Sequence, residues 1–564
     1  MYRGTGLVIR IPTPILRPLL PRPMCLPIRL VIACVSLATL TLSQAQSDQT
    51  RVRVKISTDS EADARLRPYS IVRSSPNAIM MFRNGEFDVR AFGSLKGQLD
   101  LYDREKLTYI RGQEPVTKLT NGTKLLLEDM VYFDGRPLMI ARSEGEHTTI
   151  YFQVLERNLT RLPPPYERLV SWPVDVKTKR PLVVSAGEAI RAPFMVDVSR
   201  DSSHMLIRSP EIRGGSGQAF YLFAMVGKDM EVLWQHVVPV AEKADRSSIL
   251  DVAMDDNGNA YMVLKNKFSN KEVVEDEVNF EIKLVRISAE GAVEANVDLG
   301  RDVFPSSAIL QGLADDRIAF AGVYAKASDK KLSTLGNFIT IFDSTMAFTE
   351  PMMLPFHEEG GLDAEGEPEE EPGAKFVEKD KKRMAAGTDL IDLLPKKDGG
   401  FFLVNELFYS YEYYDMSAKR SVTRYAHGPI QVRNMKASGA ELWSSTFRRW
   451  LVSSSPILGR VFAAEYDDSV FLFVLDSEEM AERRKAGEKI TPNHMKDPYS
   501  AYVSFDEKGE YKIKPVLKSG RDVDFISGWN LVRTGDSEYI ALGTEKLVSG
   551  RFLPVRIEFS TDSK

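Results

Sequence analysis

The chain has 564 residues, of which 43% are hydrophobic and 27% are charged, an ordinary composition for a soluble protein that can bury a large core. The formal net charge of −5 gives no reason to expect nucleic-acid binding, for which a basic patch or stripe is typical. The length exceeds the roughly 100–200 residues of one ordinary domain, although folds that add equivalent units around an axis can be longer.

The N-terminal segment predicts export from the cytoplasm. From Met24 the chain supplies Arg29, an apolar run at 30–42 and a small-x-small cleavage motif that ends at Ala45. Met24 is therefore the expected start, and residues 1–45 are interpreted as a signal peptide. The apolar run is shorter than the about 20 residues needed to cross a bilayer, so no transmembrane anchor is expected after cleavage.

The only two cysteines, Cys25 and Cys34, lie within this predicted signal. The cleaved chain would therefore hold neither a disulfide nor a thiolate ligand. Its net charge would fall from −5 to −10, because five arginines and no acidic residue are removed. A lipoprotein is the alternative, since 31–34 resembles a lipobox, but an apolar stretch would then follow the lipidated cysteine, where polar residues are expected.

Two kinds of segment alternate from about residue 77 to the C-terminus. The first kind is a largely apolar strand pair around a polar turn, and it recurs at 127–142, 194–209, 249–265, 308–324, 389–407, 460–475 and 530–544. The second kind is more amphipathic with a turn in its middle, and it recurs at 99–110, 151–162, 221–237, 282–297, 338–352, 430–445 and 501–516. Each unit of two hairpins is roughly 50 residues long, a period typical of propeller blades.

This pattern predicts an all-β fold, a single β-propeller of about seven four-stranded blades over residues 66–560, with six or eight blades as alternatives. Residues 46–65 form a lead-in segment. We expect the final LPVRIEF strand to close the ring with an N-terminal strand, either RVRVKI or YSIVRS. No amphipathic helix is expected to interrupt the hairpins.

The segment DDNGN at 255–259 could be a calcium loop or a tight hairpin turn. If Asp255 and Asn257 were ligands three and five of an EF-hand, positions one and twelve would be Ala253 and Leu264, which offer no side-chain ligand. The segment is therefore predicted to be a hairpin turn, and no metal site is expected. Glycine and asparagine suit such a turn because they tolerate positive φ.

Residues 357–387 interrupt the pattern with a run of acidic residues followed by a cluster of lysines. Few aromatic or β-branched residues occur there, so the stretch cannot bury enough apolar surface to order itself. It is predicted to be a mobile loop inserted between blades. A calcium site or a site for a cationic partner in its acidic half is the alternative.

Catalytic motifs are scarce in this sequence. The six histidines lie far apart, and there is no G-x-S-x-G motif, phosphate-binding loop or HExxH motif. Trp234 and Trp443 occupy equivalent places near a turn, where packing against the next blade is favoured over quinone binding. No catalytic residue, metal or cofactor is therefore assigned. Propeller active sites are assembled from distant blades, so an enzyme remains the alternative.

The hairpin at 401–434 is the most unusual local feature. Its outer half carries the tyrosines that we single out as binding residues, Tyr409, Tyr411, Tyr413 and Tyr414. The hairpin is longer than a typical strand pair, so these tyrosines are expected to project past the neighbouring blade and offer amphipathic contact area. Cross-strand pairing that only stiffens the ribbon is favoured over this binding role.

The order of these segments resembles that of exported β-propeller proteins of the Bacteroidetes type, a group without an assigned activity. The resemblance rests on LDLYDREKLTYI, VLWQHVVPV, VAMDDNGNAYMVL, KKDGGFFLVNELFYSYEYY, GAELWSS and YVSFDEKGE. It implies a propeller across the whole mature chain and gives no residue a catalytic role. The insertion at 357–387 departs from this pattern.

Two functions from different classes fit these observations. The first is a non-enzymatic binding or scaffolding protein of a Gram-negative envelope, in the periplasm or at the outer surface, with an envelope protein or a glycan as partner. The second is an extracytoplasmic hydrolase or lyase whose carboxylates come from several blades and meet at the central channel. Three or more convergent ionisable side chains at the channel mouth would favour the enzyme, and a mostly apolar mouth the binding protein.

Overall fold

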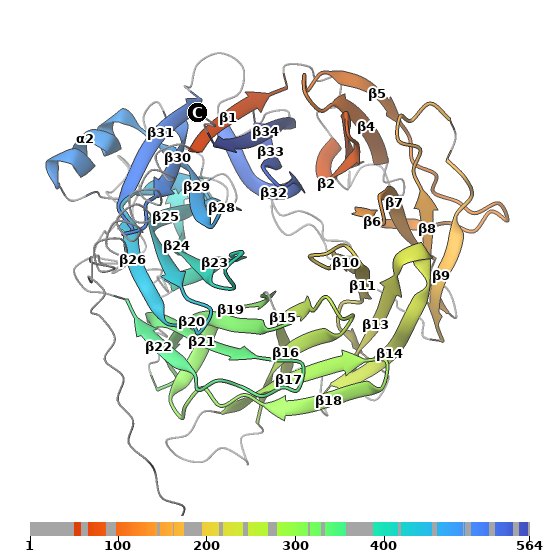
Figure 1. Cartoon of the computed structure of the whole chain (residues 1–564), viewed down its shortest axis with the longest axis horizontal. Coiled ribbons are helices and arrows are strands. Elements are labelled where there is room, and N and C mark those ends of the chain that lie inside the picture. The colour runs from red at the N-terminus through yellow and green to blue at the C-terminus, as the bar shows by residue number, and fades with distance from the viewer. Residues whose placement is uncertain are drawn as a thin grey trace, which may run out of the picture. The chain divides into compact units, whose positions relative to one another are not determined.

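Eight antiparallel sheets form a ring around a central axis in the described part of the chain (Figure 1). The computed structural model describes residues 50–561 apart from 58–65, 86–96, 144–146, 162, 174–193, 214–217, 241–245, 269–278, 314–315, 329–332, 357–386, 416–418, 454–458, 489, 491–497, 518–524 and 545–551. The fold is thus an all-β propeller, as predicted, with eight blades rather than seven. Among the described residues, no helix is long and apolar enough to cross a membrane.

The blades are numbered in chain order, and the innermost strand of each comes first. Blade 1 consists of β2 (Leu66–Ser75), β3 (Ala78–Gly85), β4 (Gly97–Asp103) and β5 (Tyr109–Gln113). Blade 2 consists of β6 (Leu126–Phe133), β7 (Arg136–Ser143), β8 (Thr148–Val154) and β9 (Glu167–Trp172). Blade 3 consists of β10 (Met195–Val198), β11 (His204–Arg208), the short β12 (Ile212–Arg213), β13 (Ala219–Gly227), the 3-10 helix η1 (Lys228–Met230) and β14 (Val232–Val240).

The next four blades repeat this plan. Blade 4 consists of β15 (Ser247–Met254), β16 (Ala260–Lys267), β17 (Phe280–Ser288) and β18 (Gly291–Asn296). Blade 5 consists of β19 (Val303–Gly312), β20 (Ile318–Lys326), β21 (Thr334–Phe342) and β22 (Met352–Pro355). Blade 6 consists of β23 (Gly387–Pro395), β24 (Phe401–Asp415), β25 (Arg420–Met435), β26 (Glu441–Phe447) and the added β27 (Leu451–Ser453). Blade 7 consists of β28 (Phe462–Tyr466), β29 (Ser469–Asp476), β30 (Tyr499–Phe505) and β31 (Tyr511–Leu517).

Blade 8 is assembled from segments near both ends of the described chain. It combines β32 (Phe525–Gly535), β33 (Glu538–Thr544) and β34 (Phe552–Thr561) with β1 (Thr50–Ile56). β1 pairs antiparallel with β34, from Thr50 opposite Thr561 to Ile56 opposite Val555. β1 contains RVRVKI, so the strand pairing expected for ring closure is present, with the first of the two candidate strands.

The sequence pattern predicts one blade too few because two half-blades escape it. The segment 99–110 is the outer half of blade 1, and its inner half is the β2–β3 hairpin. β2 carries proline and two arginines among its apolar residues, so it does not read as an apolar strand. At the other end, the hairpin at 530–544 is completed by β34 and β1, which are distant in the sequence.

The hydrophobic core lies between adjacent blades, where the sheets pack face to face. Ile140 and Phe152 of blade 2, for example, share one buried cluster with Leu222 and Val226 of blade 3. Strands such as β16 and β20 are apolar on both faces, because each central strand contacts a neighbouring blade on either side.

Trp234 and Trp443 pack against the next blade, as predicted. Trp234 on β14 is buried and donates a hydrogen bond from Nε1 to the carbonyl oxygen of Gly258 in blade 4, at 2.9 Å. Trp443 on β26 stacks on Phe505 of blade 7, with ring centroids 5.8 Å apart. Both indoles therefore join one blade to its neighbour.

The DDNGN segment is the hairpin turn between β15 and β16, as predicted. Asp255 is buried, and one carboxylate oxygen accepts hydrogen bonds from the N–H groups of Asn257 and Asn259. The other oxygen accepts from the Tyr261 hydroxyl at 2.8 Å. Gly258 has a φ of 79°, which residues with side chains rarely adopt. Both oxygens of Asp255 thus bind donors of the protein itself.

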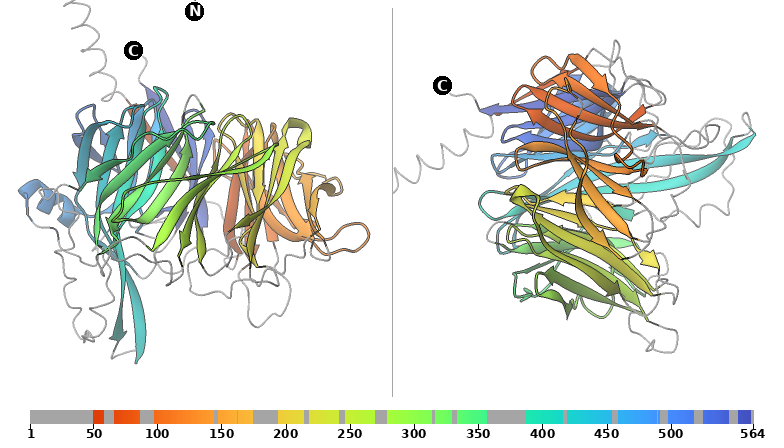
Figure 2. Two further views of the ribbon diagram at one scale, coloured as in Figure 1. Left: turned by 90° about the horizontal axis from the view of Figure 1, so that it is seen from below. Right: turned by 90° about the vertical axis from the view of Figure 1, so that its right-hand side faces the viewer.

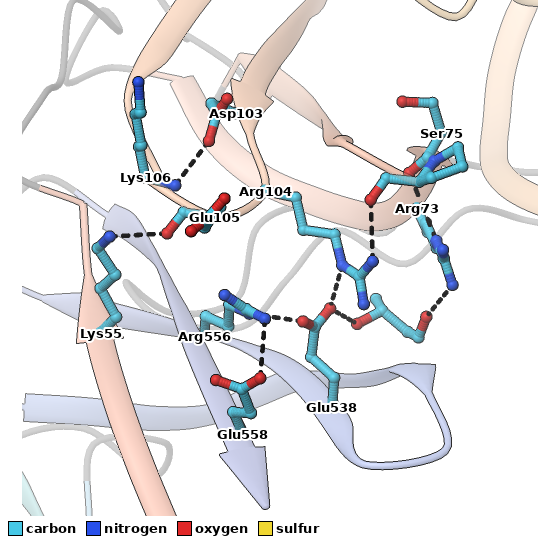
Figure 3. Close-up of polar contacts among 12 residues, drawn as sticks. Lys55, Arg73, Ser75, Asp103, Arg104, Glu105, Lys106, Glu538, Arg556 and Glu558 are labelled. Carbon is cyan, nitrogen blue, oxygen red and sulfur yellow. Dashed lines mark hydrogen bonds and ion pairs between the residues drawn. The ribbon is translucent and has the colours of Figure 1, made fainter.

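Polar side chains clamp the seam between blade 8 and blade 1 (Figure 3). Glu538 at the start of β33 is buried, and its carboxylate accepts hydrogen bonds from Arg104 Nε at 2.7 Å and Arg556 Nε at 2.5 Å. Lys55 on β1 donates to the main-chain oxygen of Glu105 at 2.7 Å. Arg104 and Glu105 follow β4, so the clamp joins blade 1 to the closing blade.

The hairpin of β24 and β25 extends away from the ring on one side (Figure 2). Its proximal part is covered by the chain itself, because β27 pairs with β25 and Met480 of helix α2 (Glu478–Ala486) packs against it. Tyr409 and Tyr411 belong to the same buried cluster as Trp450. The expectation that these two tyrosines are exposed is therefore wrong.

The short helix α2 lies between β29 and β30 and does not contradict the expectation that no amphipathic helix interrupts the hairpins. The Ser477 side chain caps its N-terminus by accepting a hydrogen bond from the Met480 N–H, and Gly487 ends it in the left-handed conformation. The helix has no apolar stripe, so hydrophobic periodicity does not reveal it. The predicted signal peptide at 1–45, and all of the predicted insertion at 357–387 except Gly387, lie outside the described residues.

Candidate functional site

The innermost strands of the blades lie around the axis of the ring, which we call the central channel (Figure 1). Several of these strands line a cavity of about 1260 Å³. Its wall comes from β2, β6, β10, β28 and β32 and from the turn after β23. A second cavity, of about 400 Å³, is lined chiefly by β10, β15 and β19. Because each strand adds only a few residues, no single stretch of the sequence carries the site.

The two cavities share part of their walls, and we call the shared residues the neck. The neck consists of Asp197, Val198, Ser199 and Arg200 of blade 3 and Arg533 of blade 8. These two blades are three positions apart in the ring. The neck therefore contains two arginines from distant parts of the chain, each of which lines both cavities.

Charged residues at the channel mouth lie on the turns between the first and second strands of the blades. Arg200 is in the β10–β11 turn, Lys397 in the β23–β24 turn and Asp536 in the β32–β33 turn. Antiparallel strands alternate in direction, so these turns lie at the opposite end of β24 from the tip of the β24–β25 hairpin. The four tyrosines of that hairpin are therefore not part of the channel mouth, and the side chains of Tyr413 and Tyr414 lie outside the described ones.

Asp129 on β6 has the most unusual environment among the acids that line the larger cavity. Its side chain is half-buried, and protein surrounds it within the channel. Burial raises the pKa of Asp129 to about 7, although the hydrogen bond from the Met130 N–H at 2.7 Å opposes this rise. The nearby carboxylates of Asp197 and Glu128 raise the pKa further. Near neutral pH the group can therefore both donate and accept a proton.

Other polar side chains of the innermost strands have a structural role. The inner edge of each first strand has backbone N–H groups that no further strand pairs. Asp251 Oδ2 of blade 4 accepts a hydrogen bond from the Leu310 N–H of blade 5 at 2.8 Å. Ser307 Oγ of blade 5 accepts from the Leu390 N–H of blade 6 at 3.0 Å. These contacts link the first strands of neighbouring blades and explain polar residues in otherwise apolar strands.

Most ionisable groups near the neck already have a partner. Asp197 lies 3.2 Å from Arg208 Nε, and Glu465 lies 3.5 Å from Arg533 Nη1. Arg200 is exposed, and no hydrogen bond or ion pair joins its guanidinium to another residue in the described part of the chain. Arg200 is therefore the neck cation that is most available to a ligand.

A separate ionic cluster lies at the base of the β24–β25 hairpin. Glu406, His427 and Arg449 are fully buried, and the Glu406 carboxylate accepts hydrogen bonds from His427 Nδ1 at 3.2 Å and from Arg449. Burial lowers the pKa of His427, which favours the neutral imidazole. None of the three lines either cavity, so the cluster anchors the hairpin rather than serving the channel.

Metal binding finds no support among the described residues, where no group of three or more His, Cys, Asp or Glu side chains could hold an ion. The acidic insertion at 357–387, for which a calcium site is the alternative, lies outside those residues except for Gly387.

Sequence reasoning does not find the channel residues, although a signal for them exists. The mostly apolar first strands of four blades each contain an aspartate near the middle, namely Asp129, Asp197, Asp251 and Asp392. Asp129 and Asp197 line the larger cavity, whereas Asp251 and Asp392 line neither cavity. An acidic residue in an otherwise apolar first strand is therefore a partial signal for the channel wall. The arginines of the neck have no comparable pattern, because they lie in or next to turns of varied sequence.

No protein-family model matches the chain, and no curated protein matches it. Solved structures that resemble it include a β-propeller domain and a WD40 domain. The β-propeller domain of the Trilobed protease from Pyrococcus furiosus has 11% identity and a TM-score of 0.32, over 79% of this chain and 94% of that chain. A protein of unknown function from Dyadobacter fermentans has 9% identity and a TM-score of 0.33, over 91% and 99%. The WD40 domain of SCAP from fission yeast has 8% identity and a TM-score of 0.33, over 90% and 98%. Likenesses this distant do not indicate a function.

Proposed function

We propose that the protein is an exported binding propeller that takes a polar ligand in its central channel. The observation that supports this most directly is the cavity of about 1260 Å³, with charged side chains from several blades in its wall. Typical ligand pockets are about 300–1,000 Å³, so the cavity is large enough for a short oligosaccharide or peptide. A few convergent polar groups in such a pocket fix the orientation of the ligand.

Binding is favoured over catalysis because most ionisable groups of the channel are occupied. More than three of them converge at the mouth, which alone would favour an enzyme. However, Asp197 and Glu465 have arginine partners. A general acid or base must instead be free to contact the substrate.

A hydrolase or lyase is the second candidate function, and Asp129 is the observation that favours it. Its pKa of about 7 suits a general acid or base at neutral pH. The test is turnover of oligosaccharides and peptides by the wild-type protein and by Asp129→Asn. Turnover that the substitution abolishes, while ligand binding persists, would make the channel catalytic.

The binding function is tested by thermal unfolding with a panel of neutral, acidic and basic oligosaccharides and peptides. A ligand that binds only the folded state stabilises it by about 2.7 kcal/mol at 100 times its Kd. At least one class should raise the Tm of the wild-type protein and fail to raise that of Arg200→Ala. Arg168→Ala on the exposed outer strand β9 is the matched control. Equal Tm shifts in all three proteins would place binding outside the channel.

Export rests on the predicted signal peptide and on the resemblance to exported propellers. Mass spectrometry of the protein recovered from the envelope fraction should show an N-terminus at Gln46. Recovery of an uncleaved chain from the cytoplasm would contradict this part of the proposal. A partner surface at the tip of the β24–β25 hairpin, with Tyr413 and Tyr414, stays a prediction.

A further inference from the structure

Two arginines stand where the two cavities of the channel meet. Arg200 and Arg533 line both cavities and are the only basic residues of the neck as the structure describes it. The acid of the neck, Asp197, is already paired with Arg208 at 3.2 Å. Arg533 also lies 3.5 Å from the Glu465 carboxylate. Arg200 is therefore the neck cation that has no ion-pair partner among the described residues, while Arg533 is shared with Glu465.

The two arginines differ in their contacts with the protein: the side chain of Arg533 is held in place, and that of Arg200 is free to adjust to a ligand. Arg533 donates hydrogen bonds to the main-chain oxygens of Gly535 at 3.3 Å and Asp536 at 3.1 Å, and it lies over the Tyr539 ring. These contacts fix its position while 46% of its side chain stays exposed. Arg200 is exposed on its turn and has no such contacts. Guanidinium groups bind carboxylates through paired, charge-assisted hydrogen bonds.

The channel wall favours an acidic sugar over an acidic peptide as the ligand that bears the carboxylate group. A peptide commonly binds by adding a strand to a free sheet edge. Here side chains of the preceding blade already bind edge N–H groups of Phe194, Leu310 and Leu390. Tyr132, which is 37% exposed, lines the same cavity and offers a rigid apolar face beside a hydroxyl group. Such a face suits the carbon–hydrogen surface of a sugar ring.

From this geometry we infer that the neck is a two-arginine clamp for the carboxylate of an acidic oligosaccharide, one that contains uronic acid residues. The inference rests on the proposed binding function and specifies its ligand class. Arg200 and Arg533 bind the carboxylate, and Tyr132 supports a neighbouring sugar ring.

The test is isothermal titration calorimetry of the full chain with three probes. These are trigalacturonate, the neutral sugar maltotriose and the acidic peptide triglutamate. We expect trigalacturonate to bind, with an affinity that falls as salt rises, and maltotriose to bind at least about tenfold more weakly. Arg200→Gln should weaken trigalacturonate binding by about tenfold or more. Arg168→Gln, on the outer strand β9, should leave it unchanged.

Arg533→Gln serves as a second variant, with its Tm measured in parallel because Arg533 also supports its own turn. Several outcomes would overturn the clamp: no binding of trigalacturonate, binding that Arg200→Gln leaves intact, or triglutamate binding as tightly as the sugar. If a neutral or basic ligand binds instead and Asp129→Asn or Tyr132→Ala weakens it, the channel is still a binding site and only the acidic-sugar inference fails.

Discussion

Arg104 and Glu538 are 434 residues apart in the chain, yet their side chains form an ion pair of 2.7 Å across the seam between blade 1 and blade 8. Glu538 is nearly inaccessible, and Arg556 pairs with its other carboxylate oxygen. The ring therefore closes through a buried carboxylate between two arginines as well as through the β1–β34 strand pair.

We expect Glu538→Ala to lower the free energy of unfolding by about 3 kcal/mol, because it leaves two partly buried arginines without their partner. Arg104→Ala should cost less, about 1 kcal/mol, because Arg556 still pairs with the carboxylate. Urea unfolding measures both. Glu105→Ala is the control, since only the main-chain oxygen of Glu105 takes part in the seam. If Glu105→Ala lowered the free energy of unfolding as much as Glu538→Ala, the loss would not be due to the buried ion pairs of Glu538.

The seam should also make stability depend on acidic pH. Burial alone would raise the pKa of Glu538, but the hydrogen bonds from Arg104, Thr534 and Arg556 outweigh it and lower the pKa below its usual 4.5. The stabilisation is thus present above about pH 4.5 and is lost as pH falls through the lower folded-state pKa. Denaturation curves measured from pH 3 to 7 give the free energy of unfolding of the wild type and of Glu538→Gln. The difference between the two values should become smaller as the pH falls. A difference that stays constant over this range would exclude the linkage.

Asp392 should make the protein less stable as pH rises, the opposite of the effect of Glu538. It lies on the innermost strand β23, and burial raises its pKa from 3.8 to about 7, against the hydrogen bond from the Leu393 N–H. The folded state therefore holds the proton more tightly than the unfolded state, and stability falls as pH rises from about 4 to 7. Asp392→Asn keeps the acceptor oxygen but cannot ionise. At pH 8 the free energy of unfolding of this variant should exceed that of the wild type by on the order of 2 kcal/mol, allowing for solvent screening. At pH 4 the two values should be nearly equal. Equal Tm differences at both pH values would refute this.

Tyr409 should be a stabilising residue, because its ring is buried against Trp450 at a centroid distance of 5.9 Å. Tyr409→Ala is expected to cost about 3 kcal/mol, in the range for deletion of a large buried side chain. Ser410→Ala changes an exposed neighbour on the same strand and should be close to neutral. If Tyr409→Ala kept the wild-type Tm while losing a partner, the binding role of the tyrosine would return.

Trp234 should stabilise the contact between blades 3 and 4 in two separable ways. Trp234→Phe removes the donor to the Gly258 carbonyl and part of the indole ring but keeps an aromatic ring, and it should cost about 1–2 kcal/mol. Trp234→Ala also removes the buried ring and should cost about 3–5 kcal/mol. Gln235→Ala on the solvent side of β14 is the control, and thermal unfolding provides the comparison. A larger loss for the Phe variant than for Ala would contradict the packing argument.

Most of the blades and some of the contacts between them could be predicted from local sequence, because hairpin turns and apolar strands each depend on a short stretch of residues. The turn at 255–259 and the packing of Trp234 could be predicted in this way, and the closing strand β1 was one of two candidates. The eighth blade could not, since β2 lacks an apolar pattern and blade 8 joins distant segments.

The candidate site was out of reach for a different reason. Arg200 and Arg533 line the same cavities only because the ring places blades 3 and 8 around one axis, and the spacing of the two residues in the sequence does not predict this. The exposure of Tyr409 and Tyr411 was predicted wrongly, because a tyrosine-rich strand can be either exposed or buried. These two tyrosines are buried by Trp450 and Met480, which lie later in the chain.

The pairing of β1 with β34 has a consequence for how the protein is made. β1 leaves the ribosome among the earliest strands, and its partner is synthesised more than 500 positions later, at the distance between Thr50 and Thr561. A contact of such high sequence separation forms late and slowly, because the chain must order many intervening residues first. Until then the nascent chain has two unsatisfied edges, one at β1 and one at β33, each able to pair with another chain. Chaperones that hold the polypeptide extended would protect this open intermediate from aggregation.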